Sequence, residues 1–231
     1  MPQYAKFSLQ QLMILMLSFL ILIIFFPIAG SIDLALIHPW IGSHGEFYLK
    51  NNWYLDQLAH QDLKHVIIGF YSILFILWLL SFKLNRLKPK RYAFGYFFFV
   101  SMLCTIAIGI LKAHSSHGCP WDMTSPSPSG FIWDFVVQNG HCFPGGHASC
   151  GFALMTGYFV YRQHQPRYAY FYLLIGFILG FAMGWTQMMR GAHFLSHNLW
   201  TLWIIWLINV VVYYITQSFY LRRHHLQIAV K

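Results

Sequence analysis

Four residues with side chains suited to anion chemistry are spread along the chain: Lys112, His147, Arg190 and His193. Each lies at or just beyond the end of an apolar segment. Lysine and arginine can hold the oxygens of a phosphate group, and a neutral imidazole can attack its phosphorus. A second, protonated imidazole can donate to the departing oxygen. The four residues therefore predict phosphoryl chemistry, provided that the fold brings them together.

His147 follows two glycines in the segment Cys142-Phe-Pro-Gly-Gly-His-Ala-Ser149, which leads directly into a predicted helix. Glycines let a backbone approach a ligand closely, and a helix N-terminus presents N–H groups without intrahelical partners. The amides of Gly145 and Gly146 would then cradle an anion, with His147 beside it to move a proton near neutral pH. The alternative is an ordinary helix cap with an incidental histidine.

The segment Arg190-Gly-Ala-His193-Phe-Leu-Ser-His197 places three polar residues at i, i+3 and i+7, on one face of a helix. Because arginine can bind phosphate with two bonds, His193 could attack an anion that Arg190 holds. Two alternatives stay open, namely side chains that snorkel into lipid headgroups and a zinc site built on His193 and His197. The zinc motif lacks its glutamate, since Phe194 takes that position, so we expect neither a metal nor another cofactor.

The composition is that of a membrane protein. Of the 231 residues, 58% are hydrophobic and only 9% are charged, which is too little charge to keep a soluble surface in water. The net charge of +9 is spread over short loops and forms no stripe that would bind nucleic acid. The four cysteines form no CxxC pair, which argues against a zinc knuckle. We find no linker that would divide residues 1–231, so we expect one integral membrane domain.

The elements that must position these residues are predicted membrane helices, since a bilayer core of about 30 Å needs about 20 apolar residues per helix. Six segments approach this length: about Leu9–Ala29, Val66–Phe82, Tyr92–Leu111, Gly146–Tyr161, Ala169–Met188 and Leu199–Ile215. The fourth is short and rich in small residues, which favours packing inside the bundle. The first exceeds the apolar core of a signal peptide and is expected to be retained. The predicted fold class is all-α, a polytopic bundle of six transmembrane helices.

The loops between these segments differ in charge. If both termini are cytoplasmic, eleven of the fifteen Lys and Arg residues lie on the inner side: Lys6, Lys83, Arg86, Lys88, Lys90, Arg91, Arg162, Arg167, Arg222, Arg223 and Lys231. The other four, and all six acids, lie on the opposite side. This distribution follows the positive-inside rule. It places the candidate site at the outer face, which is the periplasmic face if the membrane is a bacterial inner membrane.

Two longer segments lie on the outer side. The segment from Gly30 to about His65 suits either an amphipathic surface helix or a capping loop. The segment 113–145 contains several prolines and glycines and is expected to be irregular. Cys119 and Cys142 both lie in it and could form a disulfide in an oxidising compartment. Cys104 and Cys150 fall within spans and are expected to be packing residues.

These motifs resemble the type-2 phosphatidic acid phosphatase superfamily, which also includes bacterial acid phosphatases and vanadium haloperoxidases. The family pattern has three parts, K-x6-R-P, P-S-G-H and S-R-x5-H-x3-D. They match in order from Lys112 to His197, and the family's membrane members have six spans. The resemblance implies that Lys112 binds phosphate, that His147 is the general acid and that His193 is a nucleophile forming a phosphohistidine. It implies no metal.

The chain departs from the family pattern at several positions. Cys119 stands for the first arginine, Gly145 for the serine, Thr186-Gln187 for the Ser-Arg pair and His197 for the aspartate. We expect Arg190, one helical turn before His193, to reach the same anion. The group that orients His193 is left open among His197, Asp122 and Asp134. A frame that makes His197 the nucleophile is possible but breaks the spacing by one residue.

The sequence therefore predicts a metal-independent phosphatase that acts on a membrane lipid. Candidate substrates are phosphatidic acid, phosphatidylglycerol phosphate, undecaprenyl diphosphate and lipid A phosphates. A lipid phosphotransferase of the same fold is an alternative, and a lipid-binding or transport protein without catalysis is another. The expected partners are the membrane and its phosphorylated lipid; the oligomeric state stays open.

Overall fold

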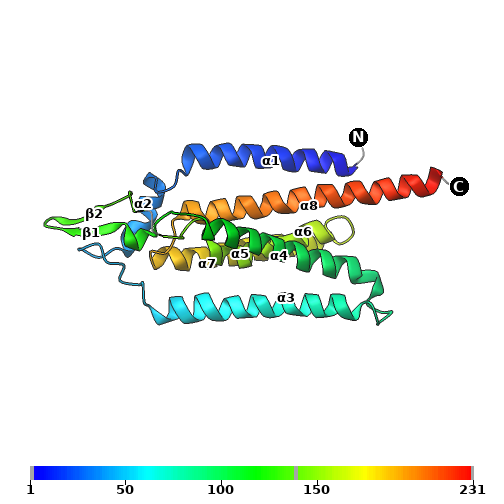
Figure 1. Ribbon diagram of the computed structural model, residues 1–231, viewed down its shortest axis with the longest axis horizontal. Helices are drawn as coiled ribbons and strands as arrows, with labels where there is room; N and C mark the ends of the chain where they lie inside the picture. Colours follow the sequence, from blue (N-terminus) through cyan, green and yellow to red (C-terminus); the bar gives the residue numbers. More distant parts are fainter. Residues whose placement is uncertain (1–2, 138–139, 230–231) are drawn as a thin grey trace.

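The computed structural model describes residues 3–137 and 140–229. Five long helices lie alongside one another and give the molecule its length (Figure 1). They are α1 (Gln3–Phe25), α3 (Leu63–Leu80), α4 (Arg91–Ala113), α7 (Pro166–Met189) and α8 (Leu195–Ala229). Each contains a stretch long and apolar enough to cross a membrane. The mostly helical fold is thereby confirmed, and five of the six predicted spans coincide with helices that could cross a membrane.

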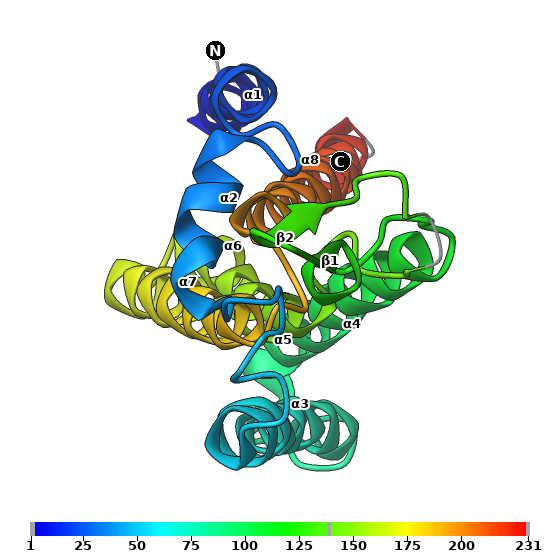
Figure 2. The same cartoon turned by 90° about the vertical axis from the view of Figure 1, so that its left-hand side faces the viewer.

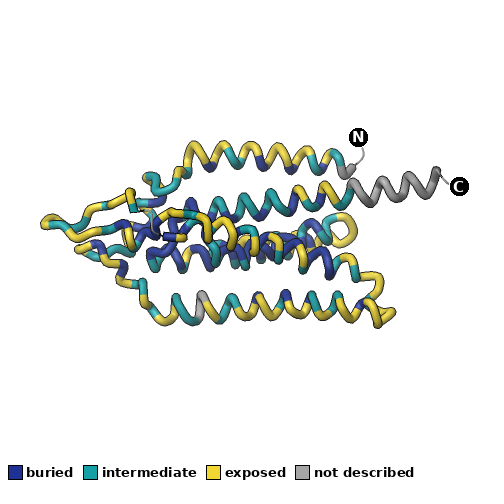
Figure 3. The backbone as a smooth tube through the Cα atoms, in the orientation of Figure 1, coloured by how far each residue is buried: buried dark blue, intermediate teal, exposed yellow. Residues whose placement is uncertain are grey.

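The fourth predicted span, 146–161, is a broken segment. It consists of α5 (Gly146–Phe152), the 3-10 turn η5 (Ala153–Met155) and α6 (Thr156–Tyr161). Its glycines allow close packing on α7, since a Cβ at Gly151 would collide with the backbone of Gly180. Most of its residues are buried, as the dark centre of the bundle in Figure 3 shows. A single sixth spanning helix was predicted here; the described segment is instead two short helices joined by a 3-10 turn.

The surface of the bundle is apolar where α1 and α3 face outward. Leu17 on α1 is 62% exposed and Val66 on α3 is 69% exposed, which would be costly in water but suits lipid. Figure 2 looks along the bundle and shows α1 and α3 on opposite sides, with α4, α7 and α8 between them. The exposed face of each helix is therefore suited to the hydrocarbon core of a bilayer.

The segments that follow α1 and α4 meet at one end of the bundle (Figures 1 and 2). The first forms the short helices α2 (Ser31–Ile37), η1 (His38–Trp40) and the π-helix η2 (Tyr54–Asp62). The sequence left open whether this segment is an amphipathic helix or a capping loop. Its short, separate helices correspond to a capping loop. The second contains η4 (Pro120–Asp122) and an antiparallel hairpin of β1 (Thr124–Ser127) and β2 (Gly130–Trp133). The hairpin corrects the expectation of wholly irregular structure between residues 113 and 145.

A small hydrophobic cluster holds both segments onto the bundle. Ile37, Phe47 and Met123 are buried against Phe194, which immediately precedes α8. Phe194 is the neighbour of His193, so this cluster fixes the backbone at the predicted nucleophile. We call the two segments, residues 26–62 and 114–145, the cap.

At the opposite end lie the start of α1, the end of α8, the α3–α4 connection with η3 (Lys88–Lys90), and the link between α6 and α7 (Figure 1). These are the places where the sequence puts most of its basic residues. Lys231, one of that set, lies outside the described residues. The cap and the basic loops thus occupy opposite ends of the bundle.

Candidate functional site

His193 lies in a short link between two long helices. Helix α7 ends at Met189, and Gly191 has a φ of 80°, a left-handed conformation that favours glycine. The amides of Ala192 and His193 then donate to the carbonyl of Gln187, at 2.9 and 3.4 Å. This tight turn brings His193 beneath the cap, where it is 1% exposed.

Within the described part of the chain, one hydrogen bond holds the imidazole of His193. Its Nδ1 lies 2.7 Å from the backbone carbonyl of Cys142. Because a carbonyl only accepts, Nδ1 must carry the proton and Nε2 must present its lone pair in the neutral ring. Nε2 is buried and has no hydrogen-bond partner among the described residues. The ring is therefore set up with one nitrogen anchored and the other available.

The surroundings of His193 keep its ring neutral. Burial lowers the pKa of His193 well below its ordinary value of 6.5, and the nearby charges of Lys112, His197 and His147 lower it further. The bond to the Cys142 carbonyl opposes this shift but does not reverse it. A neutral imidazole is the form that can act as a nucleophile at neutral pH.

The anchoring carbonyl belongs to a cysteine in a disulfide. Cys119 and Cys142 are bonded, as the sequence allowed, with their Cα atoms 5.1 Å apart. The amide of Cys142 also donates to the carbonyl of His117 at 3.1 Å. The two links fix the position of the Cys142 carbonyl, and through it the ring of His193.

The Cys142 carbonyl is the group that orients His193. The sequence left this role open among His197, Asp122 and Asp134. The carboxylate of Asp122 accepts from the indole of its neighbour Trp121 at 2.9 Å. The carboxylate of Asp134 accepts from the amide of Val136 at 3.0 Å. His197 contacts His193 through its ring, with centroids 5.7 Å apart, and the Nδ1 bond of His193 goes to Cys142. A main-chain carbonyl leaves no trace in residue types, so sequence reasoning missed it.

Lys112 and His147 lie beside His193. Lys112 ends α4, and its side chain covers Gly146: a Cβ on that glycine would lie 3.2 Å from Cδ of Lys112. His147 is the second residue of α5, and its ring centroid is 6.2 Å from that of His193. Four predicted site residues, Lys112, Gly146, His147 and His193, are thus brought together from two helices and a link.

Gly145 has a different role from the one predicted. Its amide donates to the carbonyl of His197 at 3.2 Å, so this N–H is used within the fold and is not aimed at an anion. Its own carbonyl accepts from the hydroxyl of Thr201 at 3.1 Å. A side chain at this position would collide with Asn198. Gly145 therefore docks the loop onto α8, which corrects its assignment as a phosphate donor.

Arg190 is engaged with the cap. Its Nη1 forms an ion pair with Asp56 at 2.8 Å, and its Nε donates to the carbonyl of Lys50 at 3.0 Å. A longer contact of 3.4 Å joins Nη1 to Gln187. The sequence predicted that Arg190 reaches the anion, but these three contacts lead to the first cap segment and to α7.

The interior around His193 contains further polar groups. His197 is fully buried, and its ring lies 6.2 Å from that of His117 in a stacked orientation. Within the part of the chain that the structure describes, neither nitrogen of His197 has a hydrogen-bond partner, and the same holds for Nε2 of Gln187 and Oδ1 of Asn198. Buried polar atoms without partners are costly, so this region is suited to a polar ligand or to water. No group of three or more His, Cys, Asp or Glu residues in the described ranges could hold a metal ion.

Asp33 supports the site and was not singled out by the sequence. It is 2% exposed, and its carboxylate accepts from the amide and the hydroxyl of Ser196 and from the amide of Ala29. Asp33 lies in the first cap segment and caps the first turn of α8 at Ser196, which is three residues after His193. Burial raises the pKa of Asp33 above its ordinary value of 3.8, against the opposing effect of these hydrogen bonds. Its only sequence signal is an acid just beyond the end of an apolar span.

Comparison with known families gives one match. The family model described as the PAP2 superfamily matches residues 93–220, more than half of the chain and the whole stretch from Lys112 to His197. No curated protein and no solved structure matches the chain significantly.

Proposed function

The chain belongs to the PAP2 superfamily, which includes phosphatases, and we propose that it hydrolyses a phosphate or diphosphate monoester on a membrane lipid. One observation supports this proposal most directly. His193 has its Nδ1 fixed on the Cys142 carbonyl, and its buried Nε2 has no partner among the described residues. Its ring centroid is 6.2 Å from that of His147, and the charge of Lys112 acts on it.

We propose that Lys112 and the backbone at Gly146 hold the phosphate. Phosphoryl transfer needs donors around the equatorial oxygens, where charge is spread in the transition state. Lys112 lies directly over Gly146, and its charge acts on His193. A role for Arg190 would have to use its Nη2, because Nε and Nη1 already bind Lys50, Gln187 and Asp56.

The reaction proceeds in two steps in this proposal. Nε2 of His193 attacks phosphorus, the bond from phosphorus to the lipid oxygen breaks, and His147 donates a proton to that oxygen. Water then attacks the phosphohistidine, loses a proton to His147 and releases inorganic phosphate. The neutral ring of His193 and the proton carried by His147 are the two requirements of the first step.

We propose that the substrate reaches the site from the bilayer. The helices expose apolar side chains over their length, so the chains of a lipid can stay in hydrocarbon while its headgroup enters beneath the cap. In this proposal α5, η5 and α6 together make the sixth crossing, both termini are cytoplasmic and the cap faces the periplasm of a bacterial inner membrane. Phosphatidic acid, phosphatidylglycerol phosphate, undecaprenyl diphosphate and lipid A phosphates are the candidates.

A panel assay with matched variants tests the proposal. The chain, purified in detergent with EDTA, is incubated with each candidate lipid, and inorganic phosphate is measured. His193→Ala is expected to lower kcat by about three orders of magnitude or more, because it removes the nucleophile. His44→Ala serves as a control, since His44 lies exposed on a turn of the cap and should leave the rate unchanged. Equal turnover by the wild type and His193→Ala would refute the catalytic assignment.

The role of His147 has its own test. Removing a general acid should slow the reaction strongly when the leaving group is an alkoxide, which needs a proton. The effect should be much smaller for an activated aryl phosphate, because its aryl oxide leaves without a proton. In single-turnover measurements of the first step, His147→Asn is therefore expected to slow transfer to His193 about 10²-fold or more from a lipid phosphate and only slightly from p-nitrophenyl phosphate. Equal losses on both substrates would assign His147 to binding instead.

Two outcomes separate hydrolysis from its alternatives. Rapid acid-free quenching with labelled substrate should give label on His193, followed by labelled inorganic phosphate; a labelled second lipid would indicate a phosphotransferase. A lipid-binding protein without turnover is the second candidate function. It is favoured by Cys119, which forms a disulfide where the family has an arginine, and by the pairing of Arg190 with Asp56. Retention of labelled lipid without release of phosphate would support it.

A further inference from the structure

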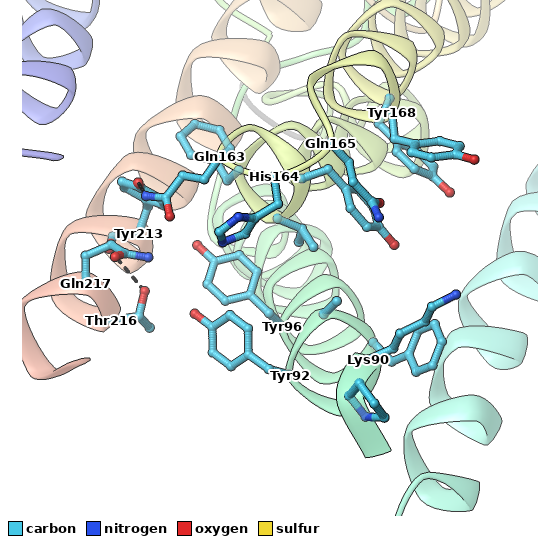
Figure 4. A pocket seen from close by; sticks show the side chains of 17 residues that line it. Lys90, Tyr92, Tyr96, Gln163, His164, Gln165, Tyr168, Tyr213, Thr216 and Gln217 are labelled. Carbon is cyan, nitrogen blue, oxygen red and sulfur yellow. Dashed lines mark hydrogen bonds between the residues drawn. The ribbon is translucent and has the colours of Figure 1, made fainter. Parts of the chain in front are cut away.

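A cavity lies at the end of the bundle opposite His193. It has a volume of about 770 Å³ and is bounded by η3 and the start of α4, the end of α6, the start of α7, and α8 (Figure 4). This size falls in the range of small-molecule sites, about 300–1,000 Å³. None of the residues proposed for catalysis lines it, so it is separate from the site under the cap.

The wall of this cavity is aromatic, with many hydrogen-bonding groups. Six tyrosines line it, together with three glutamines, His164 and Lys90. Figure 4 shows His164 and the rings of Tyr92 and Tyr96 around the same space. No Asp or Glu residue is among the lining residues. The electrostatic balance therefore favours an anion over a cation.

Two tyrosine hydroxyls in the wall need an acceptor. Tyr96 is 8% exposed, and its buried hydroxyl has no hydrogen-bond partner in the part of the chain that the structure describes. The hydroxyl of Tyr213 already accepts from Nη1 of Arg162 and from Nε2 of Gln163, each at 2.8 Å. Its own proton must therefore go to a further acceptor. Phosphate oxygens are strong acceptors, and Arg162 adds a positive charge directly behind Tyr213.

The cavity also has an apolar side and an interfacial position. Phe94, Phe159 and Val160 line it, and each belongs to a helix of the bundle. The basic η3 and the link between α6 and α7 lie at the same end. A ligand with an acyl chain could thus place its headgroup among the tyrosines and its chain along the helices toward lipid.

We propose that this cavity binds an anionic phospholipid from the leaflet opposite the catalytic end. The proposal requires that the bundle spans a membrane, and it does not depend on the phosphatase activity. The lipid phosphate accepts from Tyr96 and Tyr213, and Lys90 at the rim balances its charge.

A lysine pair in η3 provides the first test. Delipidated protein in neutral detergent is titrated with phosphatidylglycerol or phosphatidylcholine, and the rise in Tm gives an apparent Kd. Phosphatidylglycerol should bind more tightly than phosphatidylcholine. Lys90→Gln should weaken the binding of phosphatidylglycerol roughly fivefold, because that is the contribution of one lysine near an anionic lipid surface to affinity. Lys88→Gln removes the same charge two residues away, outside the cavity lining, and should leave binding unchanged. Equal effects of both variants would overturn the proposal.

The hydroxyl of Tyr96 provides the second test. Tyr96→Phe removes a buried group without a partner, so the lipid-free Tm should stay equal or rise, while affinity for phosphatidylglycerol should fall several-fold. Tyr170→Phe is the control, because Tyr170 is 63% exposed on α7 and does not line the cavity. Unchanged affinity in Tyr96→Phe would contradict the proposal. An equal Tm rise with soluble glycerol phosphate would assign the cavity to a free phosphate and overturn the lipid assignment.

Discussion

The protonation state of one buried ring governs the chemistry proposed for this protein. His193 is neutral because burial and neighbouring positive charges lower its pKa below 6.5. The same shift has a cost for stability. In the unfolded chain His193 takes up a proton as the pH falls through 6.5, whereas in the folded chain it does not. The unfolded state then binds more protons, so the free energy of unfolding decreases as the pH falls.

We therefore predict that part of the acid sensitivity of the fold comes from His193. Between about pH 6.5 and pH 5.5 the wild type should lose about 1 kcal/mol of stability through this group. His193→Gln, which cannot titrate, should lose correspondingly less over the same interval, as measured by Tm in detergent. His44→Ala, which removes an exposed histidine of the cap outside the site, is the control. The same pH dependence in His193→Gln and the wild type would show that other groups cause it.

At the scale of single residues, the sequence could predict which side chains meet in the candidate site, but not which main-chain groups they contact. Lys112, His147 and His193 could be found because lysine and histidine at the ends of apolar segments are chemically conspicuous. The carbonyl of Cys142 could not, since every residue has one and only the folded chain selects it. Gly145 was misassigned because its amide is consumed by a contact with α8 that no local pattern reveals.

At the scale of elements, the start of α8 determines where His193 sits. Asp33 caps this helix from the first cap segment through two bonds to Ser196. Asp33→Asn keeps the shape but, with Nδ2 in the place of Oδ2, loses the acceptor of both the hydroxyl of Ser196 and the amide of Ala29. We expect a loss of about 1–2 kcal/mol in stability and a fall in kcat, because the link carrying His193 is loosened. Thermal unfolding and phosphate release measure the two effects. Asp134→Asn, on an exposed side chain of the other cap segment, is the control, and equal effects of both would remove the special role of Asp33.

The packing of the broken segment on α7 gives a second prediction at this scale. Gly151 meets Gly180 so closely that an added methyl group would collide with backbone, which cannot move aside easily. Gly151→Ala should therefore lower the free energy of unfolding by about 1–3 kcal/mol. Gly69→Ala places the same methyl group in open space on α3 and should be neutral or slightly stabilising. A tolerated Gly151→Ala would mean that α5 and α7 are less closely packed than described.

Element boundaries were predictable to the extent that hydropathy sets them. The spans near α1, α3, α4, α7 and α8 follow from continuous apolar runs of sufficient length. The interruption at η5 and the hairpin of β1 and β2 could not be predicted in this way. The first depends on glycine contacts between segments, and the second has four-residue strands with no alternating pattern and a proline at position 126.

At the scale of the whole molecule, the two ends of the bundle are chemically different. One end has the cap, all six acids and the proposed catalytic residues, and the other has most of the basic residues and the tyrosine-lined cavity. Positive charge is retained on the cytoplasmic side of membranes, which is why we place the cap outside. This assignment decides which leaflet supplies the substrate and which supplies the lipid proposed for the tyrosine-lined cavity.

Labelling of single cysteines in intact cells tests this orientation. Ser129 lies exposed in the turn of the hairpin, and Arg86 lies exposed between α3 and α4 at the opposite end. Ser129→Cys should react with a membrane-impermeant maleimide from outside the cytoplasmic membrane, while Arg86→Cys should react only after that membrane is permeabilised. Both variants are made in a Cys150→Ser background, which is the control, because Cys150 is free and partly exposed, whereas Cys104 is buried and Cys119 and Cys142 are bonded to each other. The reverse labelling pattern would place His193 at the cytoplasmic face, and the substrate would then have to come from the inner leaflet.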